Sequence, residues 1–186
     1  GISFYDDINH TIITHKHAST INQSALLNLE VLEDYENPSI GIAHTRWATH
    51  GAKTDLNSHP HQSYNGKFIL VHNGIIENYK EIEAILRKNN ISNVSETDTE
   101  NIVNLLAFEY EKTKDVSKAI QCIISQMKGT WGLVIFCTET PNTLYATRQG
   151  SPLLVGHTET TALVSSEQSG FCNRVQNYFI LKHNDI

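Results

Sequence analysis

The densest group of chemically active side chains is "HTRWATHG", His44 to Gly51, which follows the strand-like lead-in "SIGIA". Arg46 carries a planar guanidinium whose paired N–H donors fit a carboxylate. Trp47 is suited either to a packed core or to a movable lid over a pocket. Because Arg46 alone is also compatible with a structural salt bridge, the stretch indicates a carboxylate site only in combination with other residues.

A second group, Asn73 and Gly74 in "VHNGIIEN", follows a short apolar run. An Asn side-chain amide and a neighbouring backbone N–H can point at one developing negative charge, which is the arrangement of an oxyanion hole. Glycine permits a close backbone approach and a positive φ. The same dipeptide is a common hairpin turn, and by itself it favours that simpler interpretation.

The third group is "SETDTE", Ser95 to Glu100. A Ser or Thr followed by acidic residues is typical of a helix start, where the side chains cap the helix and complement its dipole. Alternatively, Asp98 faces a site and binds a substrate ammonium group. Arg46 for a carboxylate and Asp98 for an ammonium would together specify an α-amino acid.

Two histidine pairs, His15-x-His17 and His59-x-His61, have a spacing used by metal ligands. No third ligand follows either pair at motif spacing, so we expect no catalytic metal and no other cofactor. The cysteines form no C-x-x-C motif, so we expect three free, mostly buried, structural thiols in a reducing compartment. These cysteines are Cys122, Cys137 and Cys172.

The composition favours one globular domain of 186 residues, with 39% hydrophobic and 18% charged side chains. A net charge of −6 argues against a nucleic-acid partner. No apolar run approaches the roughly 20 residues that cross a bilayer. The N-terminal "GISFYDD" lacks the features of a signal peptide. We therefore expect a cytoplasmic protein with no membrane partner.

Periodicity and punctuation predict strands, then helices, then strands. Strands are expected over residues 1–5, 11–17, 40–48 and 67–72, and helices over 19–33, 78–90, 98–113 and 116–129, the last ended by Gly129. Residues 54–66 are expected to form a loop. Five further strands are expected over residues 131–137, 143–149, 152–157, 161–166 and 178–184. This order indicates an α+β fold, with antiparallel sheets covered by helices.

Taken together, the motifs resemble the glutaminase domain of class II glutamine amidotransferases, in particular of the glutamine–fructose-6-phosphate aminotransferases. The resemblance covers nearly the whole chain. It rests on "GIAHTRWATHG", "NSHPH", "VHNGIIENY", "VSETDTE", "GTWGLVIF" and "GSPLLVG", in that order. It implies the four-layer αββα sandwich of N-terminal-nucleophile hydrolases, truncated here at the N-terminus.

The resemblance also implies substrate-binding roles along "HTRWATHG". Arg46 is expected to hold the α-carboxylate of glutamine, helped by Thr49 and by the backbone at His50. Trp47 is expected to be the gating tryptophan of the family, which moves as two active sites communicate.

The remaining implied roles concern the reacting amide and the amino group. Asn73 and Gly74 resemble the oxyanion-hole pair, and Gly74 is also expected to contact the substrate. Asp98 resembles the acid that binds the substrate ammonium. For Arg46, Asp98 and the Asn73–Gly74 pair, the implied roles agree with the chemistry argued from the residues themselves.

The chain departs from the family at its start. The family nucleophile is an N-terminal cysteine followed by Gly-Ile, with its own α-amine as general base, whereas this chain opens "GISFYDD". We expect about one strand and one helix to precede Gly1, and none of the three cysteines to replace the nucleophile. Residues 1–186 are thus expected to be a glutaminase domain that is incomplete at both ends, and inactive by itself.

The expected function of the complete protein is glutamine hydrolysis that supplies ammonia for glucosamine 6-phosphate synthesis. Its partners would be L-glutamine and fructose 6-phosphate, the latter bound by a sugar isomerase domain outside this chain, in a homo-oligomer. Two alternatives remain open. One is a non-catalytic glutamine-binding module, and the other is an amidotransferase domain with a different acceptor.

Overall fold

The computed structural model describes residues 1–28, 38–47 and 51–186, and an antiparallel four-stranded sheet lies at its centre. The spatial order is β4-β5-β6-β7. The two long strands, β5 and β6, pair over nine residues each, from Phe68 opposite Cys137 to Ile76 opposite Gly129. The strands are β4 (His61–Gln62), β5 (Phe68–Ile76), β6 (Gly129–Cys137) and β7 (Leu144–Gln149).

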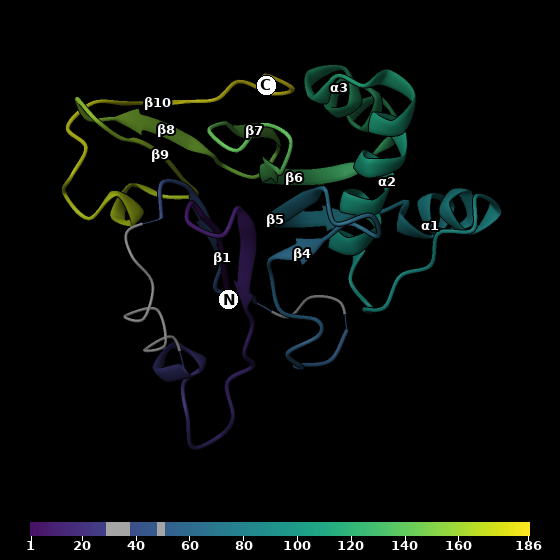
Figure 1. The fold of residues 1–186 in the computed structure, drawn as a ribbon, viewed down its shortest axis with the longest axis horizontal. Helices are drawn as coiled ribbons and strands as arrows, with labels where there is room; N and C mark the ends of the chain where they lie inside the picture. The colour runs from purple at the N-terminus through teal and green to yellow at the C-terminus, as the bar shows by residue number, and fades with distance from the viewer. Residues whose placement is uncertain (29–37, 48–50) are drawn as a thin grey trace.

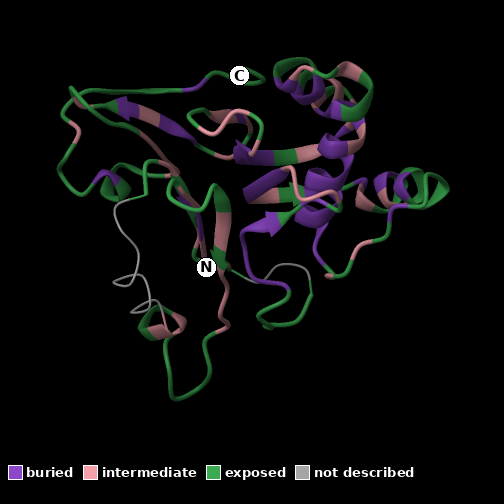
Figure 2. Ribbon diagram, viewed as in Figure 1, coloured by how far each residue is buried: buried purple, intermediate pink, exposed green. Residues whose placement is uncertain are grey.

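The central sheet is buried on both faces. Successive side chains of a strand point to opposite faces, so Phe68 and Leu70 of β5 pack into one apolar cluster and Ile69 and Val71 into another. This explains why "KFILVH" and "WGLVIFC" are continuously apolar instead of alternating. Figure 2 shows the buried residues concentrated in this sheet and in the helix behind it.

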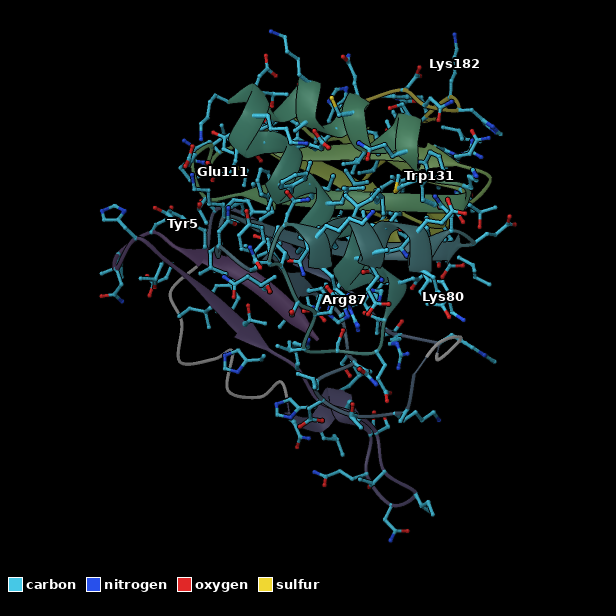
Figure 3. All side chains as sticks on the ribbon, turned by 90° about the vertical axis from the view of Figure 1, so that its right-hand side faces the viewer. Tyr5, Lys80, Arg87, Glu111, Trp131 and Lys182 are labelled. Atoms are coloured by element: carbon cyan, nitrogen blue, oxygen red, sulfur yellow. The ribbon has the colours of Figure 1, made fainter. Side chains whose placement is uncertain are left out.

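A layer of three helices covers one face of the sheet, as Figures 1 and 3 show. The side chains of Ile102, Leu105 and Leu106 are fully buried against β5 and β6. All three helices were predicted, with ends within a few residues of the observed ones. The helices are α1 (Tyr79–Lys88), α2 (Asp98–Thr113) and α3 (Val116–Gln126).

Two three-stranded antiparallel sheets pack against the opposite face. Their spatial orders are β2-β1-β3 and β10-β8-β9. Both contribute to the second apolar cluster, through Ile42 of β3 and Leu153 before β8. Their strands are β1 (Ile2–Asp6), β2 (Thr11–His15), β3 (Gly41–Ala43), β8 (Leu154–His157), β9 (Ala162–Ser165) and β10 (Tyr178–Ile180).

The α+β class is confirmed, with a helical layer, a central sheet and a second layer of strands. Outside α1–α3, the described residues contain helical structure only as short 3-10 turns, at residues 25–28 and Gln168–Phe171. The second helical layer of the expected sandwich is therefore not seen in the part of the chain that the structure describes. No helix of that part is long and apolar enough to span a bilayer.

The predicted helix over residues 19–33 is wrong where the chain is described. Residues 19–24 are not helical, residues 25–28 form one 3-10 turn, and residues 29–33 lie outside the described residues. Ser19 Oγ and Ser24 Oγ accept hydrogen bonds from the backbone N–H groups of Ala25 and Leu26. Such side-chain bonds compete with helix formation, and Leu26 and Leu27 remain exposed.

The predicted glycine stop of the third helix is also wrong. α3 ends at Gln126, and Gly129 is instead the first residue of β6, with a φ of 124°. A Cβ atom at this position would lie 2.2 Å from the carbonyl oxygen of Ile75. Gly129 thus allows β6 to approach β5 closely at the point where both strands border the helices. Other corrections are small: strand β3 ends at Ala43 rather than residue 48, and β4 lies within the predicted loop.

Candidate active site

Three segments that are distant in sequence border one pocket of about 160 Å³. They are residues 44–47 after β3, residues 72–74 near the end of β5, and residues 97–99 at the start of α2. Five of the predicted site residues lie together here; Thr49 and His50 lie outside the described residues. The lining residues are His44, Thr45, Arg46, Trp47, His59, His72, Asn73, Gly74, Thr97, Asp98 and Thr99.

Asn73 and Gly74 do not form the hairpin turn that the dipeptide alone favours. β5 continues through them to Ile76, and they pair with Gly132 and Trp131 of β6. Gly74 has a φ of 133°, and a Cβ atom there would lie 2.2 Å from the carbonyl oxygen of Thr130. Glycine is thus required both by the backbone conformation and by the space available.

Arg46 lies in the same pocket, and its Nη1 donates to the carbonyl of Ala52 at 3.2 Å. The segment beyond it is anchored by Glu96, whose Oε2 accepts from Ala52 N at 3.0 Å and from Asn57 Nδ2 at 2.9 Å. Trp47 is 90% exposed, so it is not a core residue. An exposed tryptophan at the pocket edge is compatible with a lid.

Asp98 is buried beside the pocket as the first residue of α2. Its Oδ2 accepts a hydrogen bond of 2.9 Å from Ile76 N, which ties the start of the helix to the end of β5. Thr97 caps the helix by accepting from Glu100 N. Asp98 therefore both begins α2 and borders the pocket, so the two interpretations of "SETDTE" are compatible. Arg46 and Asp98 supply opposite charges to one pocket, as a zwitterionic ligand requires.

Three histidines, His44, His59 and His72, line the pocket, and the buried His61 lies against His59. Sequence reasoning assigned no role in substrate binding or catalysis to any of the four. Burial lowers the pKa of His44, His59 and His72, and the neighbouring histidines lower that of His59 further. Burial, followed by the charge of Lys16, lowers the pKa of His61 to about 3. At neutral pH all four imidazoles are therefore uncharged.

Three of the four histidines bond threonines at the start of α2, namely the N-cap residue Thr97 and Thr99 of the first turn. His59 Nε2 and His72 Nδ1 both bond Thr99 Oγ1 at 3.2 Å, and His61 Nε2 bonds Thr97 Oγ1 at 3.1 Å. The described residues contain no group of three or more His, Cys, Asp or Glu side chains arranged to hold a metal ion. The signal that sequence reasoning missed is that each of the motifs "HTRW", "SHPH" and "VHNG" contains a histidine.

The three cysteines lie away from the pocket. Cys122 belongs to α3, Cys137 ends β6, and Cys172 follows the 3-10 turn at Gln168–Phe171. Only Cys137 is fully buried, whereas Cys172 is exposed, contrary to the expectation of mostly buried thiols. No cysteine among the described residues borders the pocket.

Comparison with known proteins places this geometry in a family. The glutamine amidotransferase domain family matches residues 44–173, which contain the whole candidate site. Glutamine–fructose-6-phosphate aminotransferase [isomerizing] of Staphylococcus aureus (strain COL) is 35% identical over 186 residues, covering 100% of this chain and 30% of that protein. The protein of the same name from Buchnera aphidicola (strain Bp) is 44% identical over 149 residues, covering 80% and 24% respectively.

Solved structures show the same fold. Glutamine phosphoribosylpyrophosphate amidotransferase from B. subtilis superimposes with a TM-score of 0.68 at 21% identity, covering 97% of this chain and 37% of that chain. At this identity the likeness establishes the fold alone. The chain spans less than a third of the length of the curated relatives that it matches. It belongs to the glutamine amidotransferase domain family.

Proposed function

We propose that this chain is the glutamine-hydrolysing domain of an amidotransferase, with residues 1–186 forming most of one glutaminase domain. The observation that carries the proposal is that Arg46, Asp98 and the pair Asn73–Gly74 border one pocket although they come from three separate elements. A guanidinium, a carboxylate and an oxyanion hole are the groups needed to bind an α-amino acid and activate its side-chain amide.

In the proposed pose, Arg46 binds the α-carboxylate of glutamine with Thr49 and the backbone of His50, and Asp98 binds the ammonium. The side-chain carbonyl then lies at Asn73 Nδ2 and the backbone N–H of Gly74. A cysteine thiolate attacks the amide carbon, and the oxyanion is stabilised by these donors. The C–N bond breaks as nitrogen takes up a proton, giving ammonia and a thioester, which water hydrolyses to glutamate. Trp47 closes the pocket.

No described cysteine borders the pocket, so the nucleophile is proposed to lie on a segment outside these 186 residues. The strands β3 and β9 are edges of their respective sheets. A hollow of about 150 Å³ lies between them, bordered also by Asn73 and by residues of β5 and β6. A further strand in this hollow would pair with unpaired edges and end beside the oxyanion hole.

The proposed whole protein is a glutamine–fructose-6-phosphate aminotransferase, since two relatives of that name cover the chain. The ammonia would aminate fructose 6-phosphate in a sugar isomerase domain outside this chain, giving glucosamine 6-phosphate. A cytoplasmic homo-oligomer that needs no metal or other cofactor is proposed with it.

Incubation of the full-length protein with an electrophilic glutamine analogue, followed by intact and peptide mass spectrometry, tests the proposal. The expected result is one adduct on a cysteine outside these 186 residues, together with glutamate release from glutamine. Labelling of Cys122, Cys137 or Cys172 would contradict the assignment of the nucleophile. Absence of glutamine binding would overturn the proposal as a whole.

The absence of a cysteine at the described pocket also favours a second candidate, a glutamine-binding module without catalysis. The same experiment separates the two, because this candidate binds glutamine without glutamate release or a covalent adduct. An amidotransferase with another acceptor would hydrolyse glutamine but would not form glucosamine 6-phosphate when fructose 6-phosphate is supplied.

A further inference from the structure

The Asn73 side chain is held from one side only. His44 Nε2 lies 2.7 Å from Asn73 Oδ1, and no described residue accepts a hydrogen bond from Asn73 Nδ2. A half-turn of the amide would exchange its oxygen and its NH₂ group between the imidazole and the pocket. Only one of the two orientations stabilises an oxyanion, because the other presents a carbonyl oxygen to the developing negative charge.

The position of the proton on His44 decides which orientation forms. If Nε2 carries the proton, it donates to Oδ1 and leaves Nδ2 directed away from the imidazole. If Nδ1 carries it, Nε2 accepts from the amide and the oxygen is turned away instead. His44 Nδ1 is buried and has no hydrogen-bond partner among the described residues. Buried N–H groups without an acceptor are rarer than acceptors without a donor, which favours the bare Nδ1.

The His44 ring stacks on His59, with centroids 4.3 Å apart and an interplanar angle of 29°. His59 is itself fixed in one tautomer. Its Nδ1 accepts from the backbone N–H of His72 at 3.4 Å, so its proton is on Nε2, which donates to Thr99 Oγ1. Thr99 in turn donates to His72 Nδ1, while His72 Nε2 donates to the carbonyl of Thr130 at 3.3 Å.

This network gives His44 a platform that is buried, uncharged and completely hydrogen-bonded. His59, His72 and Thr99 are each 5% exposed or less. A positive charge on the stacked imidazole pair would lie beside these desolvated groups, so the platform also keeps His44 neutral.

We propose that His44 is a positioning residue for amide hydrolysis: its Nε2–H tautomer, stacked on His59, turns the Asn73 amide so that Nδ2 faces the pocket. The catalytic consequence rests on the proposed function. The tautomer and the amide orientation do not, because they are argued from the contact between His44 and Asn73 and from the unpartnered Nδ1 of His44.

Neutron diffraction from crystals of the full-length protein, after exchange into deuterated buffer, tests the orientation independently of activity. The expected result is deuterium on His44 Nε2, none on Nδ1, and the ND₂ group of Asn73 facing the pocket. Deuterium on Nδ1 with the Asn73 oxygen facing the pocket would overturn the proposal, whether or not the protein hydrolyses glutamine.

Kinetics of two variants of similar size test the catalytic consequence. His44→Gln retains an N–H donor at the position of Nε2, whereas His44→Met fills the space without one. Loss of one oxyanion donor costs roughly 10²–10³ in kcat. Without the His44 donor, the Asn73 amide can rotate and still presents its NH₂ group to the pocket part of the time, so the cost is smaller. We expect kcat for glutamine to fall about ten- to a hundredfold in His44→Met, with little change in KM, and to recover largely in His44→Gln.

An exposed histidine of β8 supplies the control, since His157→Met should leave both parameters unchanged. Equal kcat values for His44→Gln and His44→Met would overturn the positioning role. A rise in KM at constant kcat would overturn it as well, because it would assign His44 to substrate binding. If the unaltered protein does not hydrolyse glutamine, the proposed function fails, and the neutron result still decides the orientation.

Discussion

At the scale of single residues, the account depends on two side chains of opposite charge in one pocket, Arg46 and Asp98. Both are proposed to contact the backbone end of glutamine. Arg46→Lys keeps the charge but loses the paired donors, and Asp98→Asn keeps the shape but loses the charge. Each is expected to lower kcat/KM for glutamine by an amount equivalent to about 2–4 kcal/mol of transition-state stabilisation. This is the range of the loss when one partner of a buried charged pair is removed.

Two comparisons give this prediction its control. In the proposed full-length aminotransferase, synthesis of the amino sugar from high ammonium concentrations should survive in both variants, because it bypasses the glutamine pocket. Arg87→Lys makes the same substitution on the exposed face of α1, where Arg87 pairs with Glu83 (Figure 3). Arg87→Lys should leave kcat/KM for glutamine unchanged. If Arg46→Lys also leaves it unchanged, Arg46 has only a structural role.

A second prediction at this scale concerns Gly74. An alanine Cβ would lie 2.2 Å from the carbonyl oxygen of Thr130, in addition to the strain of a positive φ. Gly66 also has a positive φ, but the nearest atom to its Cβ position is 3.6 Å away. We expect Gly66→Ala to lower the free energy of unfolding by about 1 kcal/mol and Gly74→Ala by clearly more, as measured by urea denaturation. Equal losses would show that β6 moves aside freely.

The sequence predicted some of these residues and missed others for physical reasons. Arg46 and Asp98 carry charge, so their chemistry is readable from residue type and from the resemblance. His44 has a role that depends on which nitrogen holds the proton and on what the ring stacks against. Both are set by His59 and Asn73, which are distant in sequence, so no local pattern contains them.

At the scale of elements, α2 positions the acid. Thr97 Oγ1 accepts from Glu100 N and also bonds His61 Nε2. Thr97→Ala removes the helix cap, which costs about 1 kcal/mol. It also leaves the buried Nε2 of His61 without its hydrogen-bond partner. We therefore expect the free energy of unfolding to fall by about 2 kcal/mol or more in total. Thr97→Ser keeps the hydroxyl and should lose well under half as much. Denaturant titration of both variants decides, and similar losses would show that packing of the methyl group dominates.

The elements also show where sequence patterns are sufficient. The three helices were predicted because each has a clear start signal or apolar periodicity and packs on the sheet. The length of β5 was underestimated because Asn73 and Gly74 have the composition of a turn, and only pairing with β6 keeps them in a strand. Residues 19–28 show the opposite error, since their apolar side chains Ile21, Leu26 and Leu27 are exposed and cover no described surface.

At the scale of the whole molecule, the buried histidines should make stability depend on pH. The pKa values of His44, His59, His61 and His72 are lowered in the folded protein, so below about pH 6.5 the unfolded chain binds protons that the folded chain does not. Stability must therefore fall as pH falls, by about 1.4 kcal/mol per pH unit for each such histidine.

The corresponding measurement is the free energy of unfolding between pH 7.5 and 5.5, a range in which ordinary carboxylates titrate little. We expect a steep loss on the acidic side and a flat curve above pH 7. A stability that is constant down to pH 5.5 would mean that the four imidazoles are charged or solvated in the folded protein.

The central claim is that Arg46 binds the α-carboxylate and Asp98 the α-ammonium of one amino acid, and calorimetric titration with truncated ligands tests it most directly. The ligands carry no amide and are therefore not hydrolysed: L-glutamate, glutarate, which lacks the amino group, and 4-aminobutanoate, which lacks the α-carboxylate. The unaltered full-length protein, Arg46→Lys and Asp98→Asn are compared. Loss of the amino group should weaken binding to the unaltered protein but scarcely to Asp98→Asn, with a coupling of about 2 kcal/mol. Loss of the carboxylate should show the same coupling with Arg46. Purely additive losses would contradict the account, because neither side chain would then contact the group assigned to it.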